Sequence, residues 1–163
     1  MRSREALANW LLCVTVNAAD GRALTFSSDP TGGDGLICDP KTDETWLTEH
    51  VMVMAPAGAT ADISDLALAA IAKKRDKGGA AYAAGKTLVV MIEGGGVWYA
   101  DRIARKLPEP LHFAAAWAVG LNGVEDGRYS YWVAMLDLGD GDAPVYCVGI
   151  AEDFASWTVT RIH

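Results

Sequence analysis

Two carboxylates are the residues of this sequence whose type and spacing suggest chemistry. Glu49 lies in the middle of the otherwise apolar, β-prone run 45–54, and Asp34 lies in Gly33-Asp34-Gly35, at the start of a short β-prone segment. A buried carboxylate needs a cationic partner or a metal ion, because burying an unpaired charge is costly. Two strands joined by a hairpin would bring both carboxylates to one edge of a sheet, where their oxygens suit Mg²⁺ or Mn²⁺. Such an ion can polarise a phosphodiester and generate hydroxide from bound water.

The elements that position these residues follow from hydrophobic periodicity and turn residues. Ser3 is the expected N-cap of the first helix, and Gly78-Gly79 is an expected break after a helix that carries basic residues near its end, as the helix dipole favours. The predicted helices are 4–16, 60–77 and 98–106, and the predicted strands are 23–26, 36–38, 45–54, 87–92, 113–121, 128–138, 145–150 and 157–162. This order predicts a mixed α/β (α+β) fold in a single domain of residues 1–163, with a central mixed sheet flanked by helices and extra C-terminal strands.

With these elements in place, the chain resembles the PD-(D/E)XK, or restriction-endonuclease-like, nuclease superfamily. The matching features are an acid in the first helix (Glu5), an acid at the start of a hairpin strand (Asp34), an acid in the next strand (Glu49), and then a lysine-bearing helix and an apolar strand. The resemblance covers roughly residues 4–93. It implies a restriction-endonuclease-like core and Mg²⁺- or Mn²⁺-dependent hydrolysis of nucleic acid. Asp34 and Glu49 would be catalytic and would hold the metal with help from Glu5.

The chain departs from the superfamily pattern at two positions. Gly33 replaces the proline that precedes the first acid, and Val51 stands where a lysine follows the second acid. In some relatives the following helix supplies that lysine. Lys74 is therefore the first candidate for charge stabilisation here, and Lys73 the second. His50 is adjacent to Glu49, but strand alternation sends its side chain to the opposite face of the sheet.

Two other interpretations of the same residues remain open. The first is a nuclease-like fold that has lost catalysis and serves as an oligomerisation or partner-binding module. The second is purely structural: Asp34 is an exposed turn residue, and Glu49 pairs with a lysine or arginine of the next helix. The basic run 73–77 with Lys86 is in turn either a phosphate-contacting patch or a solvated helix end.

Three further features have simple structural explanations. The turn Glu93-Gly94-Gly95-Gly96 lacks the G-x-G-x-x-G spacing of a nucleotide site. The six tryptophans are scattered singly, which indicates packing more than base stacking. The three cysteines are an odd number at unrelated spacings, so they form neither a zinc motif nor a disulfide framework, and no spacing supports a nucleophilic triad.

Composition narrows the class of protein. With 51% hydrophobic and 21% charged residues the chain is expected to fold, and a net charge of −7 disfavours nucleic-acid binding by bulk electrostatics, so only a local basic patch would serve. No apolar run reaches the roughly 18 residues of a membrane span. The basic N-terminus is interrupted by Glu5 and Asn9, which is unlike a signal peptide. We expect a cytoplasmic protein with no membrane association, nucleic acid as a candidate partner, and C-terminal strands that could form a homodimer surface.

Overall fold

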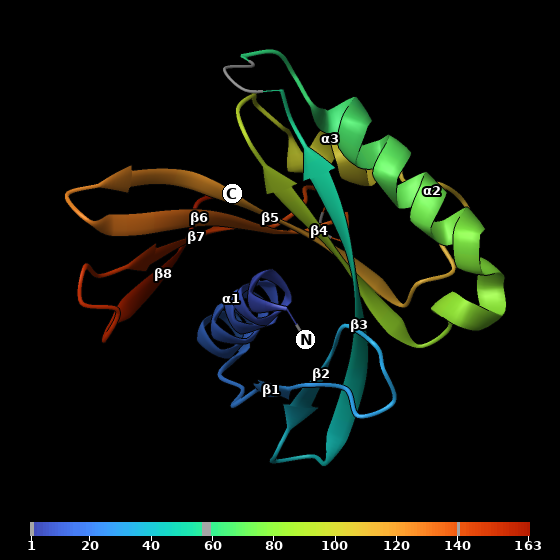
Figure 1. Cartoon of the computed structure of the whole chain (residues 1–163), viewed down its shortest axis with the longest axis horizontal. Coiled ribbons are helices and arrows are strands. Elements are labelled where there is room, and N and C mark those ends of the chain that lie inside the picture. The colour runs from blue at the N-terminus through green and yellow to red at the C-terminus, as the bar shows by residue number, and fades with distance from the viewer. Residues whose placement is uncertain (1, 57–59, 140) are drawn as a thin grey trace.

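The described residues form a single eight-stranded mixed sheet with helices on both faces (Figure 1). The computed structural model describes residues 2–56, 60–139 and 141–163. The helices are α1 (Ser3–Asp20), α2 (Ser64–Ala83) and α3 (Ala100–Arg105). The strands are β1 (Thr25–Ser27), β2 (Gly35–Asp39), β3 (Glu44–Met54), β4 (Lys86–Glu93), β5 (Ala115–Glu125), β6 (Arg128–Met135), β7 (Val145–Ile150) and β8 (Trp157–Arg161).

The strands lie in the sheet in the same order as in the chain, from β1 to β8. β3, β4 and β5 are parallel to one another, and every other neighbouring pair is antiparallel. Parallel neighbours require a crossover connection, and α2 and α3 provide the two that are needed here. The predicted mixed sheet, flanking helices and extra C-terminal strands are thus confirmed.

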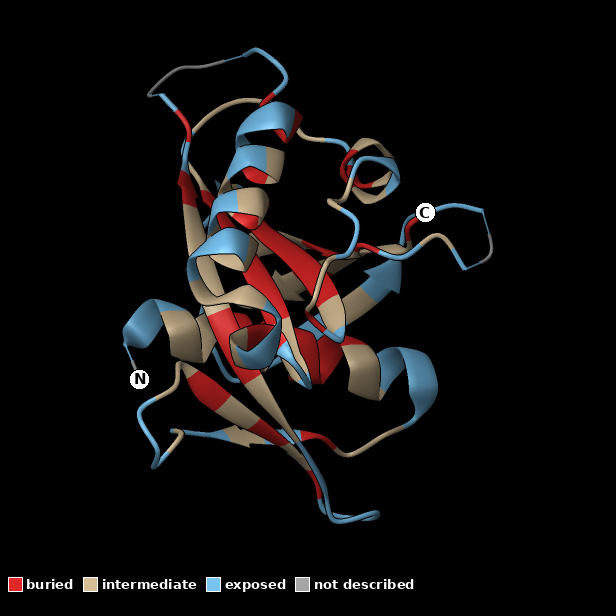
Figure 2. Cartoon of the chain, turned by 90° about the vertical axis from the view of Figure 1, so that its right-hand side faces the viewer, coloured by how far each residue is buried: buried red, intermediate tan, exposed pale blue. Residues whose placement is uncertain are grey.

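Two hydrophobic cores lie on opposite faces of this sheet. α1 lies in the concave face, where the sheet curls around it so that Trp10 of α1 contacts Trp157 of β8 edge-on at 5.4 Å (Figure 1). α2 and α3 cover the other face, and Figure 2 shows the buried residues concentrated in the central strands behind α2. β4 and β5 are covered on both faces, which explains why the run 87–92 is apolar throughout.

Strand alternation sorts the residues of β3 between these two faces. Val51 and Val53 pack with the core under α2, whereas Trp46 and Met52 pack with the core under α1. Glu49 therefore faces α2 and His50 faces α1, as the period of two predicts. The described part of the chain contains no helix that combines the length and apolar character needed to cross a bilayer.

The ends of the helices differ in detail from the sequence-based expectation. Ser3 is wrong as the N-cap of α1, because Arg2 holds the extended cap position and its backbone N–H donates to the Glu5 carboxylate. The expected break at Gly78-Gly79 is confirmed: Gly79 has φ +65° and ψ −175°, outside the helical region, and helical geometry resumes up to Ala83. That conformation suits glycine almost exclusively. The kink turns the end of α2 back toward β3 and β4.

Candidate functional site

Glu49 is the centre of a buried charged cluster on the α2 face of β3. Its side chain is 7% exposed, and each carboxylate oxygen has its own cation. Lys74 Nζ of α2 lies 2.9 Å from Oε2, and Lys86 Nζ of β4 lies 2.9 Å from Oε1. Tyr82 adds a side-chain hydrogen bond. Both carboxylate oxygens thus have an ammonium partner, which offsets the free-energy cost of burying the charge.

This pairing sets the ionisation of the cluster. Burial alone would raise the pKa of the Glu49 carboxyl, but hydrogen bonds from Tyr82, Lys74 and Lys86 outweigh it and lower the pKa to about 2. Burial would also lower the pKa of Lys74, but its hydrogen bond and its attraction to Glu49 raise that pKa above its ordinary value. Glu49 is therefore a carboxylate, and Lys74 an ammonium, throughout the physiological range.

Two features of the chain place Lys86 and Tyr82 at this point. The parallel register pairs Leu47 with Lys86, so the first residue of β4 lies beside the β3 segment that carries Glu49. After the kink at Gly79, the Tyr82 ring packs against Gly78, and a side chain at position 78 would collide with it. The ring in turn lies 3.9 Å from Lys86 Nζ, a cation–π contact that helps to fix the ammonium.

Asp34 is held by a tightly organised loop before β2. The Asp29 carboxylate accepts hydrogen bonds from the backbone N–H groups of Thr31 and Gly33, which closes the loop on itself. Gly35 lies so close to α1 that an added Cβ would stand 2.1 Å from Asn9 Nδ2. The two glycines around Asp34 therefore have packing roles, and the loop aims Asp34 at β3.

The structure connects Asp34 to His50, the residue after Glu49. Asp34 Oδ2 accepts a hydrogen bond from the His50 backbone N–H at 2.7 Å and lies 3.6 Å from His50 Nδ1. Burial lowers the pKa of the His50 imidazole below its ordinary value. The charges of Asp34, Glu5 and Glu49 oppose this shift without cancelling it. The pairing of Asp34 with His50 was not expected from the sequence.

A pocket of about 640 Å³ opens between α1, the Asp34 loop, β3 and α2. Its charged and titratable lining comprises Arg2, Arg4, Glu5, Asp34, His50, Lys74 and Lys77. Four cationic side chains stand beside two carboxylates in this lining. Arg4 is already paired with Glu93 at 3.0 Å and Lys74 with Glu49 at 2.9 Å, so Arg2 and Lys77 are the cations placed to contact a phosphate.

The predicted site residues are brought together only in part. Asp34, Glu5 and Lys74 line the pocket, and Lys74 also reaches Glu49. Val51, at the position where the superfamily pattern has a lysine, lines the pocket as well. Lys73 is exposed and is not among the residues that line it. Within the basic run 73–77, Arg75 forms a salt bridge with Asp76 at 2.7 Å. The residues of this run that line the pocket are Lys74 and Lys77.

Of the three predicted metal ligands, two are placed to bind a divalent cation in the pocket and the third is already paired. Asp34 and Glu5 present carboxylates to the pocket, whereas both oxygens of Glu49 already contact ammonium groups. Among the described residues, the group of three whose ligand atoms lie within 4.8 Å of one another is Asp101, Asp142 and His163. Arg105 already lies 3.8 Å from Asp101 and 3.4 Å from Asp142, so a guanidinium supplies positive charge there.

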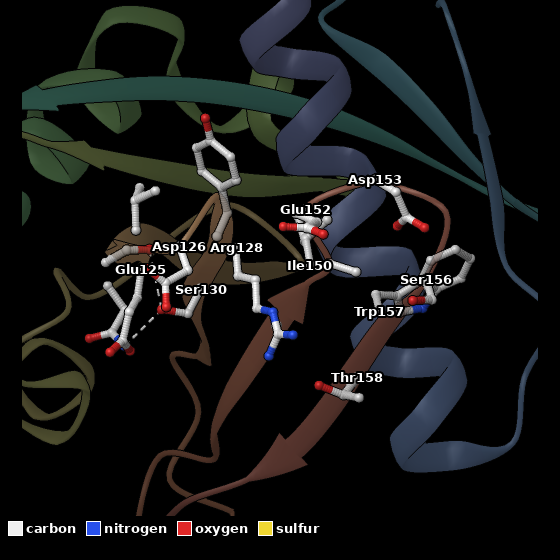
Figure 3. Close-up of a pocket in the computed structure, with 16 residues that line it drawn as sticks. Glu125, Asp126, Arg128, Ser130, Ile150, Glu152, Asp153, Ser156, Trp157 and Thr158 are labelled. Atoms are coloured by element: carbon white, nitrogen blue, oxygen red, sulfur yellow. Dashed lines mark hydrogen bonds between the residues drawn. The ribbon is translucent and has the colours of Figure 1, made fainter.

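A larger hollow of about 1000 Å³ lies between the β5–β6 and β7–β8 hairpins (Figure 3). Figure 3 shows acidic side chains on both sides of Arg128: Glu125 and Asp126 on one hairpin, Glu152 and Asp153 on the other. Four carboxylates against one guanidinium would repel a polyanion. None of the predicted site residues lines this hollow, so it lends no support to nucleic-acid chemistry.

Comparison of the chain with protein-family models, with curated proteins and with solved structures gave no match.

Proposed function

We propose that this protein is a divergent member of the PD-(D/E)XK superfamily and a metal-dependent nuclease that hydrolyses nucleic-acid phosphodiesters. The observation that carries the proposal is the position of Lys74: its ammonium lies 2.9 Å from Glu49 and lines the same pocket as Asp34. A lysine from the following helix thus stands beside the second acid, where Val51 leaves the strand without one. The pocket's arginines and Lys77 supply the basic surroundings that a phosphodiester needs.

The element order supports the restriction-endonuclease-like core. α1 carries Glu5, the antiparallel strands β1, β2 and β3 follow, and α2 then crosses to the parallel strand β4. The first acid precedes β2 and the second lies in β3, as in the superfamily pattern. β5 to β8 extend this core on the far side of β4.

The residues would divide the work as follows. Asp34 and Glu5 would hold Mg²⁺ or Mn²⁺ in the pocket. Glu49 would become a third ligand when Lys74 or Lys86 moves away from one of its carboxylate oxygens. The ion, when bound, would polarise the phosphate and lower the pKa of a water molecule. Lys74 would stabilise negative charge on the phosphate, and Arg2, Arg4 and Lys77 would hold the neighbouring phosphates in place.

The test is cleavage of single- and double-stranded DNA and of RNA with Mg²⁺ or Mn²⁺. Asp34→Asn and Lys74→Met should each lower the rate about a hundredfold or more, the loss typical of removing one group that stabilises transition-state charge. Lys73→Met is the matched control, because Lys73 is the neighbouring lysine but is exposed and outside the pocket. Absence of cleavage by the wild-type protein on all three substrates, or equal losses in the two lysine variants, would refute the proposal.

A second candidate function is a non-catalytic nuclease-like module that binds a partner or a second copy of itself. The observation that favours it is the full pairing of Glu49 by Lys74 and Lys86, which leaves neither oxygen open to an ion. β8 is an edge strand with Trp157 half exposed, and exposed edges invite strand pairing between molecules. Light scattering over a range of concentrations tests this: a stable dimer in a protein without cleavage activity supports the module, and a monomer at all concentrations opposes self-association.

A further inference from the structure

His50 is a buried polar side chain that neither the fold nor the proposed nuclease chemistry explains. Its side chain is 6% exposed and lines the pocket beside Asp34, and within the described part of the chain neither ring nitrogen has a hydrogen-bond partner. A buried polar atom without a partner costs about 1–3 kcal/mol, so such a group in a native protein calls for an explanation, of which a bound ion or water is one. β3 restricts its orientation, because the backbone at His50 is paired with Val89 of β4 on one side and donates its N–H to Asp34 on the other.

The separation between His50 and Asp34 suits a shared metal ion. Nδ1 and Oδ2 are 3.6 Å apart, which is longer than the roughly 3.2 Å limit of an ordinary N–H···O hydrogen bond. Two ligands about 2.1 Å from one ion lie about 3.0 Å apart at a right angle and about 3.4 Å apart at a tetrahedral angle. The observed separation therefore needs only a small closure, and the Asp34 carboxylate is already oriented by its hydrogen bond from the His50 backbone.

The charges around the imidazole favour a cation. Asp34 approaches from the loop before β2, Glu5 from α1 and Glu49 from the same strand. Lys74 of α2 acts in the opposite sense, but its ammonium is already paired with Glu49; Arg2, Arg4 and Lys77 line the same pocket. Asp34 and Glu5 are the carboxylates of the lining that would attract a cation to the ring. An imidazole ligand selects first-row transition ions over Mg²⁺ and Ca²⁺, which prefer oxygen.

We propose that His50 and Asp34 are the two preset ligands of a transition-metal site of the Mn²⁺ or Zn²⁺ class, with Glu5 recruited from α1 as the third. The proposal rests on the proposed function in taking Asp34 and Glu5 as metal ligands, and it differs from it in the ligand that β3 supplies. It assigns the ion to the α1 face of β3, with His50 in place of Glu49 as its strand ligand. Glu49 then keeps both of its lysines when the ion binds.

The test measures Zn²⁺, Mn²⁺ and Mg²⁺ binding by calorimetry in the absence of nucleic acid. The wild-type protein should bind Zn²⁺ and Mn²⁺ more tightly than Mg²⁺. His50→Gln and Asp34→Asn should each weaken Zn²⁺ binding by more than about tenfold, the lower end of the loss caused by removing even an outer-shell partner. His163→Gln is the control, because it removes the histidine of the exposed Asp101–Asp142 group.

A second measurement on the wild-type protein guards against a His50 variant that fails to fold. The chain has three histidines, so its imidazole signals are few and can be assigned. Substoichiometric Mn²⁺ should broaden the His50 ring signals before those of His112 and His163. Unchanged Zn²⁺ affinity in His50→Gln, or broadening confined to the other two rings, would overturn the site and leave a bridging water as the link between His50 and Asp34.

The two proposals fail separately. If Zn²⁺ binds through His50 but no nucleic acid is cleaved, the metal site stands and the nuclease function falls. If cleavage requires Asp34 and Lys74 while His50→Gln binds metal normally, the nuclease function stands and the His50 site falls.

Discussion

Glu49→Gln is the substitution that most directly tests how the buried cluster works. Glutamine keeps the shape of the side chain and removes its charge. Lys74 and Lys86, each with a side chain only 19% exposed, are then left as buried ammonium groups without a counter-ion. Removing one partner of a buried ion pair typically costs about 3–5 kcal/mol. That is a large share of the roughly 5–15 kcal/mol by which a domain is stable.

The lowered pKa of Glu49 expresses the same pairing and leads to a similar figure. The fold lowers this pKa from 4.5 to about 2. At about 1.4 kcal/mol per pKa unit, the ionised carboxylate contributes about 3 kcal/mol. Because the folded-state pKa is the lower one, this contribution is fully present above pH 4.5 and is lost as the pH falls toward 2. The wild-type protein should therefore lose its advantage over Glu49→Gln across that interval.

The assay is urea unfolding followed by tryptophan fluorescence at pH 7, 5, 4 and 3. We expect Glu49→Gln to be about 3 kcal/mol less stable than wild type at pH 7, with the difference narrowing below pH 4.5. The control is Glu44→Gln, because Glu44 pairs with Arg22 at 3.1 Å but its side chain is 59% exposed. An exposed pair of this kind contributes less than about 1 kcal/mol. Equal effects of the two substitutions, or a pH-independent difference for Glu49→Gln, would refute the reasoning.

Three further predictions concern single positions. Gly79→Ala should destabilise the protein by about 1–3 kcal/mol and by more than Gly21→Ala. The reason is that Gly79 combines φ +65° with ψ −175°, whereas Gly21 has the ordinary left-handed geometry of a helix C-cap. Urea unfolding measures both losses of stability, and a larger loss for Gly21→Ala would contradict the strain assigned to Gly79. Gly35→Ala should cost about 1–3 kcal/mol in the same assay, since its Cβ would stand 2.1 Å from Asn9 Nδ2, and a neutral effect would mean that α1 moves away freely. Cys13 should resist iodoacetamide at pH 8 in the folded protein and react in urea, because burial raises its pKa to about 12; equal labelling by peptide mass spectrometry in both states would contradict this.

Local patterns in the sequence were enough to predict the order of the elements. The alternation in 45–54, the apolar run 87–92 and the turn residues between them each reflect forces that act within a few residues. Alternation also correctly placed Glu49 and His50 on opposite faces. A lysine of the next helix as the partner of Glu49 followed from burial alone, because a buried carboxylate needs a cation.

The rest of the cluster depends on contacts between distant segments. Lys86 reaches Glu49 only because the parallel register sets Leu47 beside Lys86, and no local pattern specifies that register. Asp34 reaches His50 because the loop closed by Asp29 turns the carboxylate past the edge of β2. The available signal was the Gly33-Asp34-Gly35 sequence, whose glycines permit close approach without revealing what they approach.

Glu49 and His50 are adjacent in the sequence, but they lie on opposite faces of β3 in different surroundings. On the α2 face, Glu49 forms salt bridges with Lys74 and Lys86, and its charge stabilises the fold. On the α1 face, the buried His50 ring has no hydrogen-bond partner among the described residues and lies beside the oriented Asp34 carboxylate. A residue that is already paired resists recruitment by an ion, because a lysine must first be displaced, whereas an unpaired imidazole gains a bond at no such cost. Substitutions at Glu49 should therefore change stability more than metal affinity, and substitutions at His50 the reverse. That opposite pattern would locate the ion on the α1 face whether or not the protein cleaves nucleic acid.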